Sequence, residues 1–336
     1  MVSHFVMTIS LVSTRLFALL LQQSQIVLFY HPKNCNILFH MATNKKKQMK
    51  QLFTFLFTSV SLFTLSQKKQ SLLWEVSGNG LSKPSYIFGT FHIMCKDDFK
   101  LSDTLKQKIK ATEQFYGELD MDDPNMQTAM IPFMQLKDKT LKELMGEADF
   151  EKANTAFTKI AGMPLTALNN FKPMMAMSML MIKSTACNVQ NQVQPETALM
   201  NIAKETNSPV LGLETVADQM AALDMQPLEE QVRDMKKVIL NFDSAKQVFA
   251  EMTKVYLKND VDALYSFVKT YTNNSNSKEF EQAILNKRNK SWISPIQNAM
   301  TLKPTFFAVG AGHLGGKEGV LNLLRKQGYT LTPIAY

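Results

Sequence analysis

The sequence predicts an α+β (α/β) fold in which one mixed central sheet is built from both ends of the folded region. Runs rich in β-branched and aromatic residues, typical of strands, occur near residue 72 and again near residue 305 of the 336-residue chain. Between about 124 and 302, apolar residues recur instead at helical spacing. We therefore expect the sheet to enclose a long helical insertion.

Four elements open the predicted domain. LLWEVS (72–77) and SYIFGTFH (85–92) read as paired strands, because turn residues separate them. SDTLKQKIKAT (102–112) begins with serine and aspartate, which suit an N-cap, and is predicted as a helix. QFYGELD (114–120) is predicted as a third strand. Strand, helix and strand in this order are typical of a βαβ unit with parallel strands.

The insertion is predicted to be almost entirely helical. Asp243–Ser244 and Asp260 are candidate caps between its later helices. A short buried strand in SPVLGLET (208–215) is the one expected interruption. Helical spacing is clearest over three stretches: 228–239, 248–255 and 261–271.

The last segment returns to alternating strand and helix. TFFAVGAGH (305–313) predicts a strand and a turn. GGKEGVLNLLRKQG (315–328) predicts a helix that ends at Gly328. YTLTPIAY (329–336) predicts the final strand.

The net charge of +8 comes mainly from the N-terminal stretch. Residues 1–66 hold six basic residues and no acidic one, so 31 basic residues face 29 acidic ones in the rest of the chain. These later charges are interspersed and form no basic patch in the sequence. We therefore predict no nucleic-acid partner.

Residues 41–67 have the pattern of a secretory signal peptide. MATNKKKQMK carries a lysine cluster, and an apolar run over 52–65 follows it. We expect export to the periplasm or out of the cell, with cleavage near residues 66–68. Residues 1–40 are expected to be a mis-assigned upstream extension.

The alternative to cleavage is a membrane anchor at the N-terminus. The apolar segment 5–22 is nearly long enough for a span, but Arg15 in its middle disfavours that reading. Contact with a membrane is therefore expected only through an uncleaved N-terminus.

Two Gly-x-x-His motifs end strand-like segments, Gly89 to His92 and Gly310 to His313. The other three of the five histidines lie within residues 1–40. Each strand would deliver its histidine to the carboxyl edge of the sheet, so two such strands could bring both imidazoles together. The end of a third strand puts Glu118 or Asp120 at the same edge. Two histidines and a carboxylate are a common ligand set for a catalytic transition metal. Hydrogen-bonded structural histidines are the alternative.

Two cysteines follow residue 67, Cys95 and Cys187. An even number in an exported protein favours a disulfide, which would tie the loop after His92 to the helical region. Two separate thiols are the alternative.

Several motifs together resemble the TraB/GumN family, whose wider group includes Tiki metalloproteases. They are YIFGTFHIMCKDDFKLSDTL, FYGELDMDDPN, VLGLETVADQM, RNKSW and FFAVGAGHLGGKEGVLNLLRKQGY, in this order, and the resemblance covers about 70–336. It implies a hydrolase of peptides or of small amides or esters, dependent on a divalent metal such as manganese, cobalt or zinc.

The resemblance also implies roles for individual residues. His92, His313 and Glu118 are the implied catalytic residues and metal ligands, with Glu118 as third ligand or general base. Substrate-binding roles fall on three further residues: Glu214, Arg288 and Asn289. Each of these residues also has an alternative without a function. Glu214 would be an acidic residue near a helix terminus. Arg288 and Asn289 would lie on a solvent-exposed helix face.

Two other functions fit the same residues. The first is a non-catalytic protein that binds a small peptide or a haem-like ligand through the two histidines. The second is a metal-free, esterase-like hydrolase in which His92 is a general base assisted by Glu118. The sequence leaves the substrate and the oligomeric state open.

Overall fold

The computed structural model describes residues 70–273 and 278–336. The predictions for residues 1–40 and 41–67 lie outside them. No helix within the described residues is long and apolar enough to cross a membrane.

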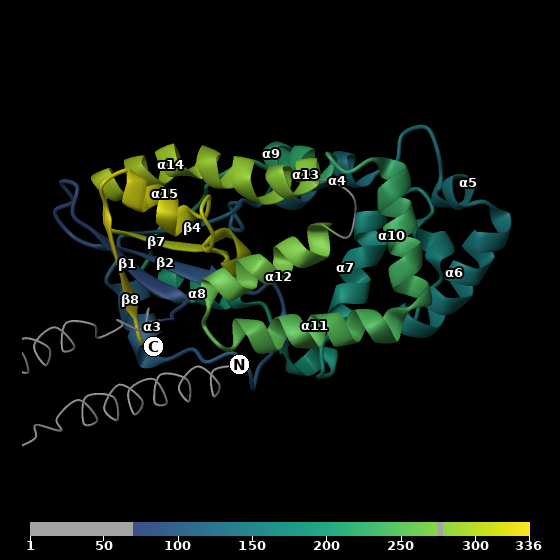
Figure 1. The fold of residues 1–336 in the computed structure, drawn as a ribbon, viewed down its shortest axis with the longest axis horizontal. Helices are drawn as coiled ribbons and strands as arrows, with labels where there is room; N and C mark the ends of the chain where they lie inside the picture. Colours follow the sequence, from purple (N-terminus) through teal and green to yellow (C-terminus); the bar gives the residue numbers. More distant parts are fainter. Residues whose placement is uncertain (1–69, 274–277) are drawn as a thin grey trace, which may run out of the picture. The chain divides into compact units, whose positions relative to one another are not determined.

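A six-stranded mixed sheet lies toward one end of the described region, and much of the helical insertion extends away from it (Figure 1). The strand order is β6-β4-β7-β2-β1-β8. β2, β7, β4 and β6 run parallel to one another, and β1 is antiparallel to both β2 and β8. The predicted α+β fold is confirmed. The strands are β1 (Leu73–Ser77), β2 (Ser85–Thr90), β4 (Gln114–Gly117), β6 (Val210–Gly212), β7 (Thr305–Gly310) and β8 (Thr330–Ile334).

The sheet differs from the prediction in where its strands come from. β6 lies inside the helical insertion, yet it pairs with β4 and forms an edge of the central sheet. β2 and β4 are parallel as predicted, but β7 from the end of the chain lies between them. Chain segments separated by about two hundred residues thus become neighbours.

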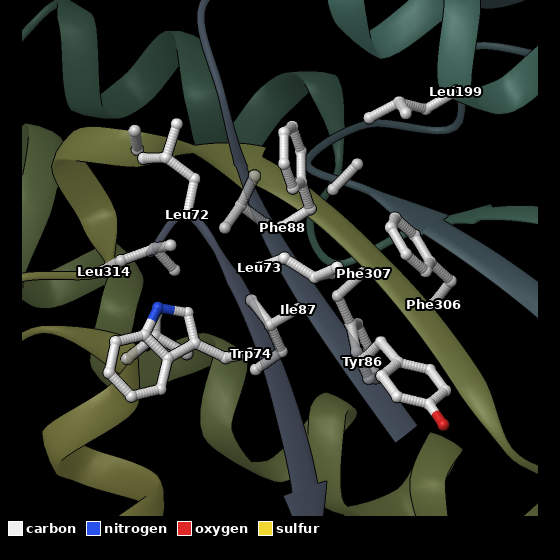
Figure 2. Close-up of a cluster of buried hydrophobic side chains, with 14 of the residues drawn as sticks. Leu72, Leu73, Trp74, Tyr86, Ile87, Phe88, Leu199, Phe306, Phe307 and Leu314 are labelled. Atoms are coloured by element: carbon white, nitrogen blue, oxygen red, sulfur yellow. The ribbon is translucent and has the colours of Figure 1, made fainter. Parts of the chain in front are cut away.

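The core of the sheet is apolar on both faces. Every residue of β2 is buried, and in β7 only Gly310 is partly exposed. Phe88, Phe306 and Phe307 are fully buried between the strands and the covering helices (Figure 2). Burying a side chain of this kind contributes about 1.5–3 kcal/mol. The sheet therefore offers a rigid base for the loops at its edge.

Helices α3, α8, α14 and α15 pack against the sheet and share its core. α3 (Asp103–Lys110) begins as predicted, because the Ser102 side chain accepts a hydrogen bond from the Leu105 N–H. The other three of these helices are α8 (Pro195–Glu205), α14 (Arg288–Leu302) and α15 (Val320–Lys326). α15 is shorter than the predicted helix, because Gly316 adopts a φ of 81° and residues 315–319 form a loop.

The rest of the insertion contains a second apolar core between α5, α6, α7 and α10. α12 is capped by Asp260, as predicted, through the N–H groups of Asp262 and Ala263. The cap predicted at Asp243–Ser244 is wrong, because α11 already begins at Phe242. The helices are α4 (Met126–Met134), α5 (Leu141–Met145), α6 (Glu147–Ala161), α7 (Pro173–Ser184), α9 (Val216–Leu223), α10 (Leu228–Leu240), α11 (Phe242–Tyr256), α12 (Val261–Asn273) and α13 (Lys278–Glu281).

Short elements complete the fold. A second sheet pairs β3 (Met94–Cys95) with β5 (Gln192–Val193). It was not predicted, because two-residue strands carry no detectable alternation. A π-helix, η3 (Gln282–Lys287), leads directly into α14. Three 3-10 turns are η1 (Leu165–Leu168), η2 (Val189–Asn191) and η4 (Ala311–His313).

Candidate functional site

The carboxyl ends of three neighbouring parallel strands bring the predicted site residues together. His92 follows β2, Glu118 follows β4, and His313 lies in η4 immediately after β7. A methyl group placed on Gly310 would lie 3.1 Å from Glu118 Oε1, 3.5 Å from His313 Cδ2 and 4.0 Å from His92 Cε1. The three side chains therefore surround Gly310, which leaves them room because it has no side chain.

Arg288 is the cation at the centre of this site. Its Nε donates to both carboxylate oxygens of Glu214, at 3.0 and 3.1 Å. Its Nη2 donates to Glu214 Oε1 at 2.6 Å and to Glu118 Oε2 at 2.5 Å. Its Nη1 lies 3.2 Å from His313 Nε2 and donates to the Ile284 carbonyl at 3.1 Å. All five N–H groups of the guanidinium can therefore be occupied within the protein.

The π-helix explains how Arg288 reaches so many partners. Arg288 is the first residue of α14, and its side chain folds back over η3 to the Ile284 carbonyl. A π-helical turn widens the backbone and re-aims the residues that follow, which is why such turns recur at functional sites. The guanidinium also lies 4.8 Å from the centre of the Trp292 ring, which supports it by a cation–π contact.

Glu118 is an ionised carboxylate in a largely buried position. Its side chain is 13 % exposed, and Oε1 accepts a hydrogen bond from the Gly310 N–H at 2.8 Å. Burial opposes ionisation, but His313 in its protonated form at low pH, Arg288 and His92 together outweigh burial and lower the pKa of Glu118 to about 2. Glu118 therefore carries its negative charge at neutral pH.

His313 is a buried, neutral imidazole with a defined tautomer. Burial lowers its pKa to about 4. Nδ1 lies 2.6 Å from Asn289 Oδ1, and the Asn289 amide nitrogen donates to the Glu318 carbonyl. Because that second bond fixes Oδ1 toward the ring, we assign the proton to Nδ1. The lone pair is then on Nε2, which lies 3.8 Å from Glu118 Oε1.

His92 differs from His313, because its side chain is 65 % exposed. Its Nδ1 lies 3.0 Å from Oε1 of Glu196, a residue in the first turn of α8. The hydrogen bond that the ring donates to Glu196 raises the pKa of His92 above its ordinary value of 6.5. The metal-free alternative in the sequence analysis gave His92 the carboxylate of Glu118, but the structure pairs its Nδ1 with Glu196.

Glu214 lies deeper than the other residues of the site, with a side chain 4 % exposed. Besides Arg288, it accepts hydrogen bonds from Trp292 Nε1 at 3.0 Å and from Gln219 Nε2 at 3.2 Å. The same Gln219 nitrogen also donates to Glu118 Oε2. The residues predicted to bind substrate thus form one hydrogen-bonded network with two of the predicted ligands, Glu118 and His313.

Three members of this site were missed by sequence reasoning: Glu196, Gln219 and Trp292. Trp292 lies four residues after Arg288, one turn along α14, and that spacing could have suggested it. Gln219 lies in α9, whereas Glu214 precedes that helix, so no helical spacing links the two. No sequence signal connects Glu196 to His92, because 104 residues separate them.

The donor atoms at this site are of the types that bind a divalent transition metal, although Arg288 contacts two of the donor side chains, Glu118 and His313. Nδ1 of each histidine has an oxygen partner, from Glu196 for His92 and from Asn289 for His313. Metal-binding imidazoles usually have such a partner on the ring nitrogen that does not bind the ion, so Nε2 is the nitrogen left for the ion. Glu118 supplies an ionised carboxylate. Within the described residues, however, no three or more His, Cys, Asp or Glu side chains are close enough to hold one ion.

A model of the TraB/PrgY/gumN family matches residues 72–333. The chain belongs to this family. Among curated proteins, metalloprotease TIKI2 of Danio rerio is 22 % identical in an alignment that covers 79 % of this chain and 61 % of that protein. The chain therefore spans about three fifths of that relative's length. No solved structure showed significant similarity to the chain.

Proposed function

We propose that this TraB/PrgY/gumN family member is an exported hydrolase that cleaves a peptide or a related amide or ester bond. The observation that supports it most is the meeting of an ionised carboxylate and two imidazoles around Gly310, at one edge of a sheet. The likeness to a metalloprotease supports the hydrolytic class.

In this proposal His92, His313 and Glu118 hold one divalent ion, with manganese, cobalt or zinc as candidates. When bound, such an ion supplies a hydroxide nucleophile at neutral pH and polarises the substrate carbonyl. The protein fixes the donors, because Asn289 and Glu196 each hold an imidazole by its Nδ1.

Arg288 is the proposed group for the carbonyl oxygen of the substrate. Two of its nitrogens are held by Glu214, so the guanidinium keeps its orientation when other partners change. The Nη1 group, now 3.2 Å from His313 Nε2, is the donor that can turn to a developing oxyanion. Trp292 and Gln219 keep Glu214 in place for this role.

Export is supported by the structure only through its disulfide. Cys95 and Cys187 are joined in a disulfide, and such bonds persist in oxidising compartments. The signal-peptide pattern of residues 41–67 supports the same proposal, with residues 70–336 as the exported domain. Anchoring through an uncleaved N-terminus is the alternative, and mass analysis of the exported protein distinguishes the two.

A metal-free hydrolase is the second candidate, because Arg288 contacts both Glu118 and His313 where an ion would be expected. In that case His92 would act as the base, held by Glu196. Since the pKa of His92 is raised, activity of this kind should increase with pH as the ring loses its proton.

Peptidase activity with and without chelator tests the proposal. We expect activity on a mixed peptide library that chelation abolishes and that manganese, cobalt or zinc restores. Glu118→Gln should be inactive. Glu113→Gln is the control and should keep its activity, because Glu113 is exposed and lies just before the same strand. Activity that survives complete chelation would contradict the metal mechanism and favour the second candidate. A haem absorption band after haem addition, without turnover, would favour a binding protein.

A further inference from the structure

The contact between Glu196 and His92 joins two distant parts of the chain at the site. His92 Nδ1 and Glu196 Oε1 are 3.0 Å apart, and the Glu196 side chain is 22 % exposed. The His92 ring is mostly exposed and lies in a loop after β2. An exposed ring with no fixed partner samples several rotamers. Glu196 is therefore the contact that selects one orientation of the ring.

The β3–β5 sheet determines where Glu196 lies. β3 begins two residues after His92, and β5 ends three residues before Glu196. The register pairs Met94 with Val193 and Cys95 with Gln192. This short sheet therefore holds the loop that carries His92 against the segment that leads into α8.

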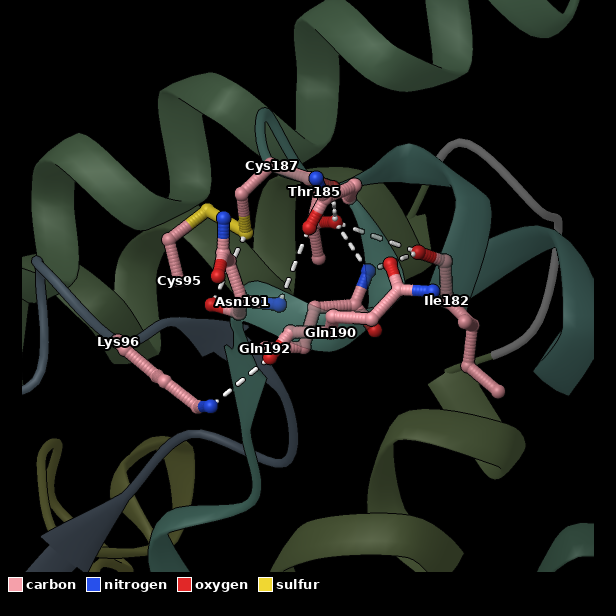
Figure 3. Close-up of a disulfide and its surroundings, with 9 residues drawn as sticks. Cys95, Lys96, Ile182, Thr185, Cys187, Gln190, Asn191 and Gln192 are labelled. Carbon is pink, nitrogen blue, oxygen red and sulfur yellow. Dashed lines mark hydrogen bonds between the residues drawn. A yellow bond between two sulfur atoms is a disulfide. The ribbon is translucent and has the colours of Figure 1, made fainter.

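A covalent bond reinforces this short sheet. Two-residue strands are marginal without further support. The disulfide joins Cys95 of β3 to Cys187, which lies in the loop before β5 (Figure 3). Lys96 adds two hydrogen bonds on the same side, from its N–H to the Asn191 carbonyl and from its Nζ to the Gln190 carbonyl, both at 2.8 Å.

The loop that carries Cys187 is itself anchored to the end of α7. The side-chain nitrogen Nε2 of Gln192 donates to the Ile182 carbonyl at 2.8 Å and to Thr185 Oγ1 at 2.6 Å (Figure 3). The disulfide thus connects the His92 loop to an ordered segment.

We propose that Glu196 is a positioning residue for His92, and that the Cys95–Cys187 disulfide keeps the two together. Glu196 acts through the imidazole and does not contact substrate. Loss of the disulfide then loosens the site without removing any group from it. The importance of this for catalysis rests on the proposed function, but the contact itself can be tested without metal or substrate.

Proton–nitrogen NMR of the full chain with isotope-labelled histidine tests the contact directly. The signal of His92 is identified by its absence in His92→Gln. We expect a protected Nδ1–H proton in the wild type and in Glu196→Gln, whose amide oxygen still accepts, and its loss in Glu196→Ala. Glu205→Ala, at the other end of α8, removes a carboxylate paired with Lys110 and should change nothing. An unchanged signal in Glu196→Ala would overturn the positioning role.

The disulfide is tested in the same spectra. Both mild reduction and the double change Cys95→Ser with Cys187→Ser should weaken or remove the protected proton, while circular dichroism shows the fold retained. If the proton is as protected without the disulfide as with it, the disulfide does not hold the contact.

Cobalt titration, followed by visible absorption, separates this proposal from the proposed function. Loss of an outer partner of a ligand typically weakens metal binding by about 10–100-fold. We expect such a loss in Glu196→Ala and near wild-type affinity in Glu196→Gln. If the wild type takes up no cobalt while the NMR results hold, the metal mechanism fails and the positioning role stands. Equal affinity in the wild type and Glu196→Ala would overturn the positioning of His92 for metal.

Discussion

Arg288 offers the sharpest test of the buried charge network. Arg288→Met keeps much of the apolar stem but removes the cation between Glu118 and Glu214, and with it the cation–π contact with Trp292. Removing one partner of a buried ion pair costs about 3–5 kcal/mol, because the remaining charge is left unpaired. Glu118 and Glu214 are both left in this state, with side chains 13 % and 4 % exposed.

The pKa of Glu118 also gives a free energy, that of ionising this carboxyl group in the folded protein. Its pKa lies at about 2 instead of 4.5, and each pKa unit corresponds to about 1.4 kcal/mol. The ionised form is therefore favoured by about 3 kcal/mol in the folded protein. This is the net effect of all the surroundings of Glu118, of which Arg288 supplies only a part. Because the folded pKa is depressed, this stabilisation is full above about pH 4.5 and is lost as the pH falls toward 2.

Urea denaturation of the wild type and Arg288→Met at pH 7 and pH 3 measures both effects. We expect the variant to lose about 3–5 kcal/mol at pH 7 and clearly less at pH 3, where protonation neutralises the unpaired Glu118. Arg233→Met is the matched control, since Arg233 is exposed and, among the residues that the structure describes, pairs with Glu230 alone, at 3.8 Å. Its expected cost is below about 1 kcal/mol. Equal costs for the two variants, or a deficit that does not change with pH, would refute the reasoning.

Two further predictions concern backbone and imidazole packing. Gly315→Ala should destabilise the protein by about 1–3 kcal/mol in urea denaturation, because its Cβ would lie 2.1 Å from the Val261 carbonyl oxygen. Gly312→Ala meets nothing closer than 3.5 Å and should cost much less, so the reverse order would be inconsistent with the structure. Asn289→Leu should cost about 1–3 kcal/mol in the same assay, because it leaves the buried Nδ1–H of His313 without an acceptor; full stability would contradict the assigned tautomer.

Much of the fold follows from short-range patterns. The hairpin β1–β2 and the helix α3 were predictable, because alternation, turn residues and an N-cap serine are local signals. The short sheet β3–β5 and the pairing of β6 with β4 were not, because both depend on contacts across the insertion. The local signals also misplaced the cap of α11, since α10 and α11 meet with only Asn241 between them.

The candidate site shows the same division. His92, Glu118 and His313 could be brought together from sequence, because each follows a predicted strand and parallel strands end at a common edge. The network around Arg288 could not be predicted, since its position depends on a π-helical turn. Glu196 was beyond reach for a different reason: its approach to His92 depends on a disulfide and a two-residue ladder.

The most direct test of the central claim is a crystal of the protein soaked in manganese, with anomalous scattering used to locate the ion. We predict one manganese ion at the carboxyl edge of the sheet, bound by Nε2 of His92, Nε2 of His313 and the carboxylate of Glu118. Arg288 should have moved away from Glu118 while keeping its contact with Glu214. A fully soaked crystal with no manganese at this edge, and with Arg288 still bonded to Glu118, would contradict the claim.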